Sequence, residues 1–110
     1  TKTEEELSIL KQFDCDIVQR NKGIDAFLKK YYLNAPVALK IQKKAETFQE
    51  ASQLLLAAAM KKKCSFMVLI TYETDWQEEA ELLPPNLIVL SRYETQLEHI
   101  MKKKMLRQVQ

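Results

Sequence analysis

The chain has 110 residues, a length that suits one domain built around one compact core. Apolar residues make up 46% and charged residues 29%, as in ordinary globular proteins, and no apolar run approaches the roughly 20 residues of a membrane span. The net charge of +2 is too small to indicate nucleic-acid binding by itself. We therefore expect a single cytoplasmic domain over residues 1–110. Because the sequence starts at Thr1 without a methionine, we expect this domain to be cut from a longer protein.

The first part of the chain is predicted to form one helix and three strands. Thr3 is the expected N-cap of the helix, whose first turn holds three glutamates. Alternating apolar and polar residues predict the strands, and Gly23 makes the turn between the first two. These elements are expected over residues 3–12, 13–20, 24–32 and 36–44. The three strands form a meander.

After the third strand the spacing of apolar residues changes from two to 3.6, which predicts a helix. Capping-box sequences that begin at Thr47, Thr74 and Ser91 indicate three helix starts. Two mainly apolar runs between these helices predict buried strands, joined to the sheet by right-handed parallel crossovers. The elements are expected over residues 47–62, 65–72, 77–83, 86–90 and 91–107. The order α-β-β-β-α-β-α-β-α predicts an α/β fold with a mixed sheet.

Polar residues at the ends of two neighbouring strands indicate a candidate site. Asp25 opens the second strand, and Gln42 and Lys44 lie at the end of the third. Side chains two residues apart on a strand share a face, so Lys40, Gln42 and Lys44 are predicted to point the same way. Asp25 on the adjacent strand is expected to meet them. The sequence thus predicts a carboxylate beside an amide and an ammonium group.

The segments Gly23-Ile24-Asp25 and Ile41-Gln42-Lys43-Lys44 resemble the PD-(D/E)xK nuclease superfamily. The nearest variety is the Mrr-type restriction endonuclease, whose strand motif tolerates Gln in place of the first acid. The resemblance extends through the order of elements over residues 13–100, with Ile24 where the family has proline. It implies a restriction-endonuclease-like α-β-β-β-α-β core, with an extra strand and helix at the C-terminal end. The implied activity is a metal-dependent DNA endonuclease of the restriction type.

The resemblance also implies roles for the matching residues. Asp25, Gln42 and Lys44 would be catalytic, and Mg²⁺ or Mn²⁺ would be held by Asp25, the Gln42 side chain and the main-chain carbonyl of Lys43. Lys44 would orient the attacking water or stabilise the phosphorane. With glutamine at position 42 only one ligand carries a charge, so metal binding is expected to be weak. A further acid would have to converge, and the candidates are Asp14, Asp16 and Glu6.

DNA is the expected partner, together with a homodimer partner or other domains of a larger protein. The lysines predicted to contact nucleic acid are Lys40, Lys43, Lys61, Lys62 and Lys63. The alternative for such lysine runs is a solvated helix end, where cations complement the helix dipole. If these lysines contact DNA, the affinity for DNA should weaken steeply as the salt concentration rises.

Two other interpretations remain open. One is a catalytically inactive nuclease-like domain that acts as a DNA- or protein-binding module, which the shortage of acids favours. The other is a regulatory α/β domain that uses Trp76 and the acidic helix after it for protein contact. Cys15 and Cys64 lack the companions of a zinc site and are expected to be buried thiols.

Overall fold

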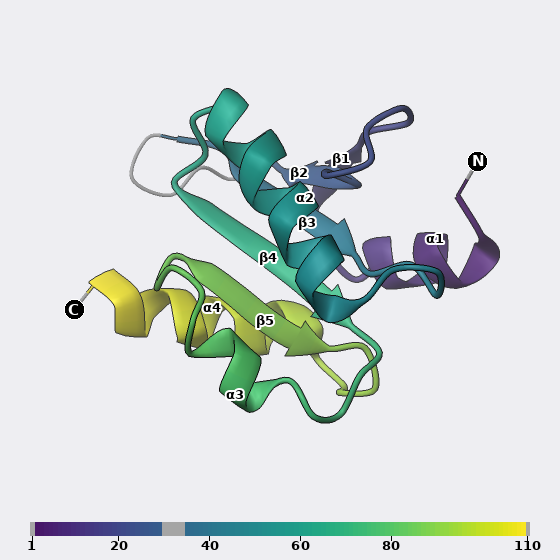
Figure 1. The fold of residues 1–110 in the computed structure, drawn as a ribbon. Coiled ribbons are helices and arrows are strands. Elements are labelled where there is room, and N and C mark those ends of the chain that lie inside the picture. The colour runs from purple at the N-terminus through teal and green to yellow at the C-terminus, as the bar shows by residue number, and fades with distance from the viewer. Residues whose placement is uncertain (1, 30–34, 110) are drawn as a thin grey trace.

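The computed structural model describes residues 2–29 and 35–109, which form a five-stranded mixed sheet with helices on both faces (Figure 1). The predicted order of elements is confirmed. The elements are α1 (Glu4–Leu10), β1 (Cys15–Ile17), β2 (Ala26–Leu28), β3 (Val37–Ile41), α2 (Phe48–Lys61), β4 (Phe66–Thr71), α3 (Gln77–Ala80), β5 (Leu87–Ser91) and α4 (Leu97–Val109).

The strands lie in the order β1-β2-β3-β4-β5. β1, β2 and β3 pair antiparallel, whereas β3, β4 and β5 pair parallel, as the meander and the two crossovers predict. The sheet therefore changes direction at β3, and the carboxyl ends of β3, β4 and β5 meet at one edge. All five residues of β3 are buried, because helices cover both of its faces.

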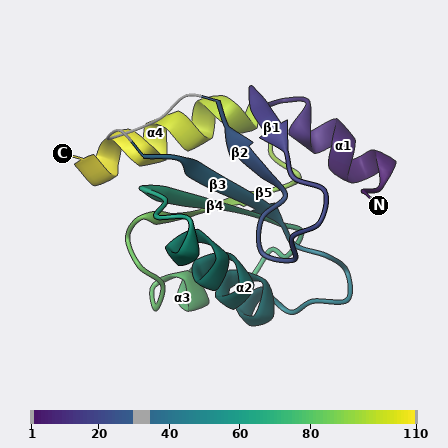
Figure 2. The same cartoon turned by 90° about the horizontal axis from the view of Figure 1, so that it is seen from above.

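The sheet separates two hydrophobic cores. Figure 2 shows α1 and α4 on one side of the sheet and α2 and α3 on the other. Leu39 points into the core beneath α1 and α4, and its neighbour Ala38 points into the core beneath α2. Residues of β3 thus alternate between the cores, and the strand's last residues carry this alternation into the candidate site. In the part of the chain that is described, no helix is long and apolar enough to cross a membrane.

Gly23 lies where the loop between β1 and β2 packs against the backbone of α2. A Cβ atom at this position would be 2.3 Å from the Leu54 carbonyl oxygen and 2.6 Å from the Ala58 Cβ atom. Real Cβ contacts are not so short, so only glycine fits here. The sequence predicts Gly23 correctly as a turn residue, but the reason is the close approach of two backbones.

The helix starts follow the capping predictions only in part. Thr47 accepts a hydrogen bond from the Glu50 amide and caps α2 as predicted. The other two predicted boxes are wrong. α3 has Trp76 as its N-cap, without a side-chain cap bond among the described residues, and α4 begins only at Leu97. Ser91 ends β5, and its hydroxyl accepts from the Tyr93 amide in a turn.

The first two strands are shorter than predicted. β1 and β2 have three residues each, and residues 30–32 of the predicted second strand lie outside the described residues. Phe13 is buried in the core as expected, whereas Ile17 is 41% exposed. Cys15 packs against the core, but Cys15 and Cys64 are half-buried and not the fully buried thiols that were expected. The alternation of apolar and polar residues in the first strand therefore continues to Ile17, which does not pack in the core.

At the other end of the sheet, β5 has a neighbouring strand, β4, on one side only among the described strands. Lys104 of α4 donates a hydrogen bond to the Val89 carbonyl of β5 at 2.8 Å. Its ammonium nitrogen also lies 5.4 Å from the centre of the Trp76 ring. The side chain thus connects α4, the last strand and the start of α3.

Candidate functional site

Two polar clusters flank the carboxyl end of β3. The first, on the side of α1, is the Asp25 cluster, which consists of Lys2, Glu6, Asp25 and Lys43. The second, on the side of α2, is the Lys40 cluster, which consists of Lys40, Gln42, Glu46 and Thr71. Together they contain four of the residues that the sequence singled out as site residues, Asp25, Lys40, Gln42 and Lys43, but on opposite faces of the sheet.

Asp25 is the centre of the first cluster and is only 2% exposed. Its Oδ2 atom accepts a hydrogen bond from the Ile41 amide at 2.7 Å. Its Oδ1 atom lies 2.9 Å from the Lys2 ammonium nitrogen and 3.0 Å from that of Lys43. Asp25 therefore fixes the end of β3 through one oxygen and binds two cations through the other.

These contacts set the charge of Asp25. Burial raises the pKa of this carboxyl, but the Ile41 amide, the Lys2 ammonium and the Lys43 ammonium together lower it further. The net pKa lies below its ordinary value, so Asp25 is ionised at neutral pH.

Lys43 connects Asp25 to Glu6 of α1, with which it also forms an ion pair. Burial lowers the pKa of Lys43, but Glu6 and Asp25 raise it above its ordinary value. Burial likewise raises the pKa of Glu6, and the hydrogen bond from Lys43 outweighs it, so that this pKa is lowered. An ammonium group thus lies between two carboxylates, and all three groups are charged at neutral pH.

The Lys40 cluster is more deeply enclosed. Lys40 is 0% exposed and donates to the Lys22 carbonyl at 2.7 Å and to Glu46 at 3.3 Å. The Gln42 side chain donates to the Glu46 carbonyl at 3.0 Å and accepts from the Thr71 hydroxyl at 2.6 Å. These bonds hold the segment after β3 onto β4 and onto the loop before Asp25.

The predicted trio is therefore not brought together by contacts in this structure. Gln42 is bound to Thr71 and Glu46, and Lys44 is exposed. The lysine that reaches Asp25 is Lys43. The prediction assumed that strand alternation continues to position 44. β3 ends at Ile41 instead, and Lys43 extends toward α1 while the Lys43 amide donates to Glu46 in a turn.

The lysines expected to contact nucleic acid also fall into different environments. Lys40 is fully buried, so its ammonium does not reach a phosphate outside the protein. The surface position that a DNA contact from Lys40 requires is therefore not found. Lys43 is half-buried in its ion pairs. Lys61, Lys62 and Lys63 are exposed at the far end of the 14-residue α2, about 20 Å from its start beside Glu46.

The Mg²⁺ or Mn²⁺ that the resemblance implies would need oxygen atoms that can serve as its ligands. The Gln42 oxygen accepts from Thr71, and the Lys43 carbonyl accepts from the Glu46 amide at 3.0 Å. The Asp25 carboxylate is bound by two ammonium groups and an amide. No group of three or more His, Cys, Asp or Glu side chains that could hold a metal occurs within residues 2–29 and 35–109. Arranged in this way, the residues do not fit a divalent cation.

A hollow of about 480 Å³ opens beside the Asp25 cluster. Besides Lys2, Glu6, Asp25 and Lys43, the loop between β1 and β2 lines it. From this loop Arg20 and Lys22 are exposed, which gives the hollow four cationic and two acidic side chains among those described. We call it the Asp25 hollow.

Glu6 was a named candidate for a converging acid, and it is the one that meets Asp25 through Lys43. Lys2 and Lys43 were missed as partners of Asp25. For Lys43 the signal was its place two residues after Ile41, on the face toward α1. Lys2 carries no local pattern that predicts its contact. Comparison of the chain with protein-family models, curated proteins and solved structures gives no match.

Proposed function

We propose that the chain is a nuclease-like domain that binds DNA through the Asp25 hollow without hydrolysing it. The observation that carries the proposal is the Asp25 cluster, in which Lys2 and Lys43 neutralise Asp25 and Glu6. The first six elements have the order α-β-β-β-α-β, which is the order that the resemblance implies, and a helix, a strand and a helix follow them.

The absence of hydrolysis is argued from the donor atoms. Cleavage of a phosphodiester at neutral pH needs a group that activates water and a group that stabilises charge in the transition state. In the Asp25 cluster an ammonium lies between the carboxylates, and the predicted neutral oxygens are used by Thr71 and Glu46. A buried ammonium can balance charge, but it cannot acidify a bound water as a divalent cation does.

Binding of DNA is argued from the charge of the hollow. Because Lys2 and Lys43 offset the two carboxylates, the exposed Arg20 and Lys22 leave a positive rim. Phosphate contacts from such side chains supply most of the affinity for nucleic acid, and the arginine fork suits phosphate geometry. The Asp25 hollow therefore suits the sugar-phosphate backbone better than a base edge.

The test uses a fluorescent DNA duplex and anisotropy at several salt concentrations. The double variant Arg20→Gln/Lys22→Gln should bind more weakly and reduce the salt slope by about two, because each lost phosphate contact lowers it by roughly 0.9. The control Lys103→Gln/Arg107→Gln removes the same side-chain types from exposed positions of α4 and should bind as the parent does. A triple Gln variant at residues 61–63 tests the lysine run at the far end of α2.

The same DNA incubated with the parent protein and Mg²⁺ or Mn²⁺ should stay intact. Cleavage that Asp25→Ala abolishes would overturn the proposal in favour of the metal-dependent endonuclease, with Asp25 and Glu6 as its carboxylates. Equal weakening by the rim variant and the α4 control would show that only overall charge matters. If the parent does not bind DNA at all, a protein-binding module remains.

A further inference from the structure

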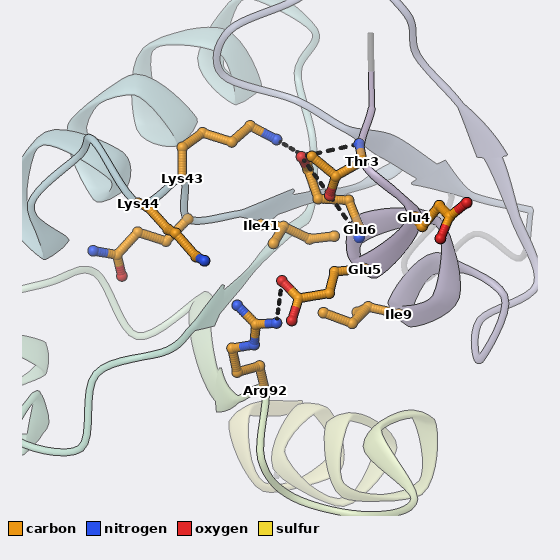
Figure 3. A pocket seen from close by; sticks show the side chains of 10 residues that line it. Thr3, Glu4, Glu5, Glu6, Ile9, Ile41, Lys43, Lys44 and Arg92 are labelled. Carbon is orange, nitrogen blue, oxygen red and sulfur yellow. Dashed lines mark hydrogen bonds and ion pairs between the residues drawn. The ribbon is translucent and has the colours of Figure 1, made fainter.

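A second hollow of about 470 Å³ lies between α1 and the carboxyl ends of β3 and β5. Its apolar lining residues, Ile9 and Ile41, are 7% and 2% exposed (Figure 3). Its charged lining residues are three acids and three cations, namely Glu4, Glu5, Glu6, Lys43, Lys44 and Arg92. β3, β4 and β5 form the parallel part of the sheet, so the hollow lies at the carboxyl ends of parallel strands.

Arg92 is the fixed cation of this hollow. Its side chain is only 15% exposed, its amide donates to the Thr71 carbonyl at 2.8 Å, and its guanidinium lies 5.7 Å from the centre of the Tyr93 ring. The main chain of Arg92 is thus fixed on the end of β4, and its guanidinium lies near the Tyr93 ring. A guanidinium oriented in this way can bind two oxygens of one anion.

An anion already occupies that place, and it is the Glu5 carboxylate. Its Oε2 atom lies 2.9 Å from a guanidinium nitrogen of Arg92, although 64% of the Glu5 side chain is exposed. The hydrogen bond and charge of Arg92 lower the pKa of Glu5, and Lys44 adds to the effect. Figure 3 shows Glu5 turned toward Arg92 and Glu4 turned away from it. Arg92 therefore binds the Glu5 carboxylate directly, and the charge of Lys44, which lines the same hollow, also acts on it.

An exposed ion pair of this kind contributes little to stability, so a competing anion can replace it at small cost. A phosphate is the stronger competitor, because it accepts bidentate hydrogen bonds from arginine and carries more charge than a carboxylate. Ile9 and Ile41 line the same hollow, and the small surface that they expose is the apolar contact for an attached organic group.

We propose that this hollow binds a phosphate monoester joined to a planar or apolar group, of which a nucleoside monophosphate is the simplest example. The phosphate takes the place of Glu5 on Arg92 and Lys44, and the organic group lies on Ile9 and Ile41. Glu5 acts as a built-in competitor that leaves when the ligand arrives. The inference does not depend on DNA binding at the Asp25 hollow.

The test is an NMR titration of the whole chain with adenosine 5′-monophosphate, with inorganic phosphate and adenosine as reference ligands. Glu5→Gln should tighten binding of the monophosphate by about tenfold, since it removes the competing anion. Glu4→Gln removes the same charge from the same helical turn and should have a much smaller effect. Arg92→Gln should weaken binding by about tenfold or more, and Arg92→Lys should restore it only in part, since lysine lacks the fork.

Equal affinities of Glu5→Gln and Glu4→Gln would overturn the inference, as would an Arg92→Gln protein that is folded by its spectrum and binds like the parent. Adenosine binding as tightly as its monophosphate would also contradict it. Single strands with and without a 5′-phosphate distinguish a DNA end from a free nucleotide as the source of the phosphate. The Arg20→Gln/Lys22→Gln variant should keep this binding, which separates its outcome from that of the DNA proposal.

Discussion

The two polar clusters at the end of β3 are made of similar groups but differ in their surroundings. The Lys40 cluster is closed, since Lys40 is fully buried and its partners include main-chain carbonyls. The Asp25 cluster is open, since 36% of the Lys43 side chain is exposed beside a hollow. The first holds the chain together, whereas the second leaves part of its charge exposed beside the hollow. Neighbouring lysines of one segment thus have different tasks, decided by the face on which each lies.

The largest difference between the clusters should appear when each loses its lysine. Lys40→Met should cost about 3 kcal/mol or more, because it leaves the Glu46 carboxylate and the Lys22 carbonyl without their buried donor. Lys43→Met should cost about 1 kcal/mol or less, because its ion pairs are partly exposed to water. Urea denaturation of the two variants measures both values. Equal losses would show that the clusters do not differ in the way described.

A smaller effect should follow from removing a neutral partner of the closed cluster. Thr71→Val keeps the shape of the buried side chain but leaves the Gln42 oxygen without its hydroxyl donor. The expected loss is about 1 to 3 kcal/mol, the usual cost of an unsatisfied buried acceptor. Thr74→Val, at an exposed position three residues later, is the control and should change stability by about 0.5 kcal/mol or less. A loss of the same size in both variants would contradict the role given to the hydroxyl.

The smallest effect should be the contribution of Asp25, in the open cluster, to the pH dependence of stability. The folded-state pKa of Asp25 is lower than its unfolded value, which is about 3.9 for aspartate. Its stabilisation is therefore fully present above the unfolded pKa and is lost as the pH falls through the folded pKa. Asp25→Asn should flatten the decline of stability in acid, and denaturation between about pH 5 and 2 measures it. If stability falls with pH equally steeply in Asp25→Asn and in the parent, the ion pairs of Asp25 do not contribute as described.

The fold was largely predictable, because apolar spacing reports which residues face a core. The change of period after β3 and the apolar runs of β4 and β5 fixed the order of elements. The helix starts at α3 and α4 were not predictable from capping boxes alone. Ser91 uses its hydroxyl in a turn, and Gln96 has a φ of 58°, which keeps the chain out of a helix until Leu97.

The site was predictable in its location and not in its pairing. Asp25 and the end of β3 do lie together, since the Asp25 carboxylate accepts from the Ile41 amide. Strand alternation holds for Lys40 and Gln42, which share one face as predicted, but Asp25 lies on the opposite face, where Lys43 reaches it. Lys44 comes after the end of β3 and is exposed. Lys2 comes from a distant segment, and such long-range contacts follow from tertiary packing that a local pattern does not contain.

The hydrogen bond from Lys104 to the Val89 carbonyl bears on how this protein behaves when concentrated. β5 is an outermost strand, and an outermost strand with bare carbonyls invites another chain to add itself. Here α4 extends a long cationic side chain across that border, and the Trp76 ring holds it there. A strand of another chain that paired with β5 at this carbonyl would have to displace the Lys104 ammonium. One side chain of the last helix thus occupies a main-chain carbonyl of this border strand.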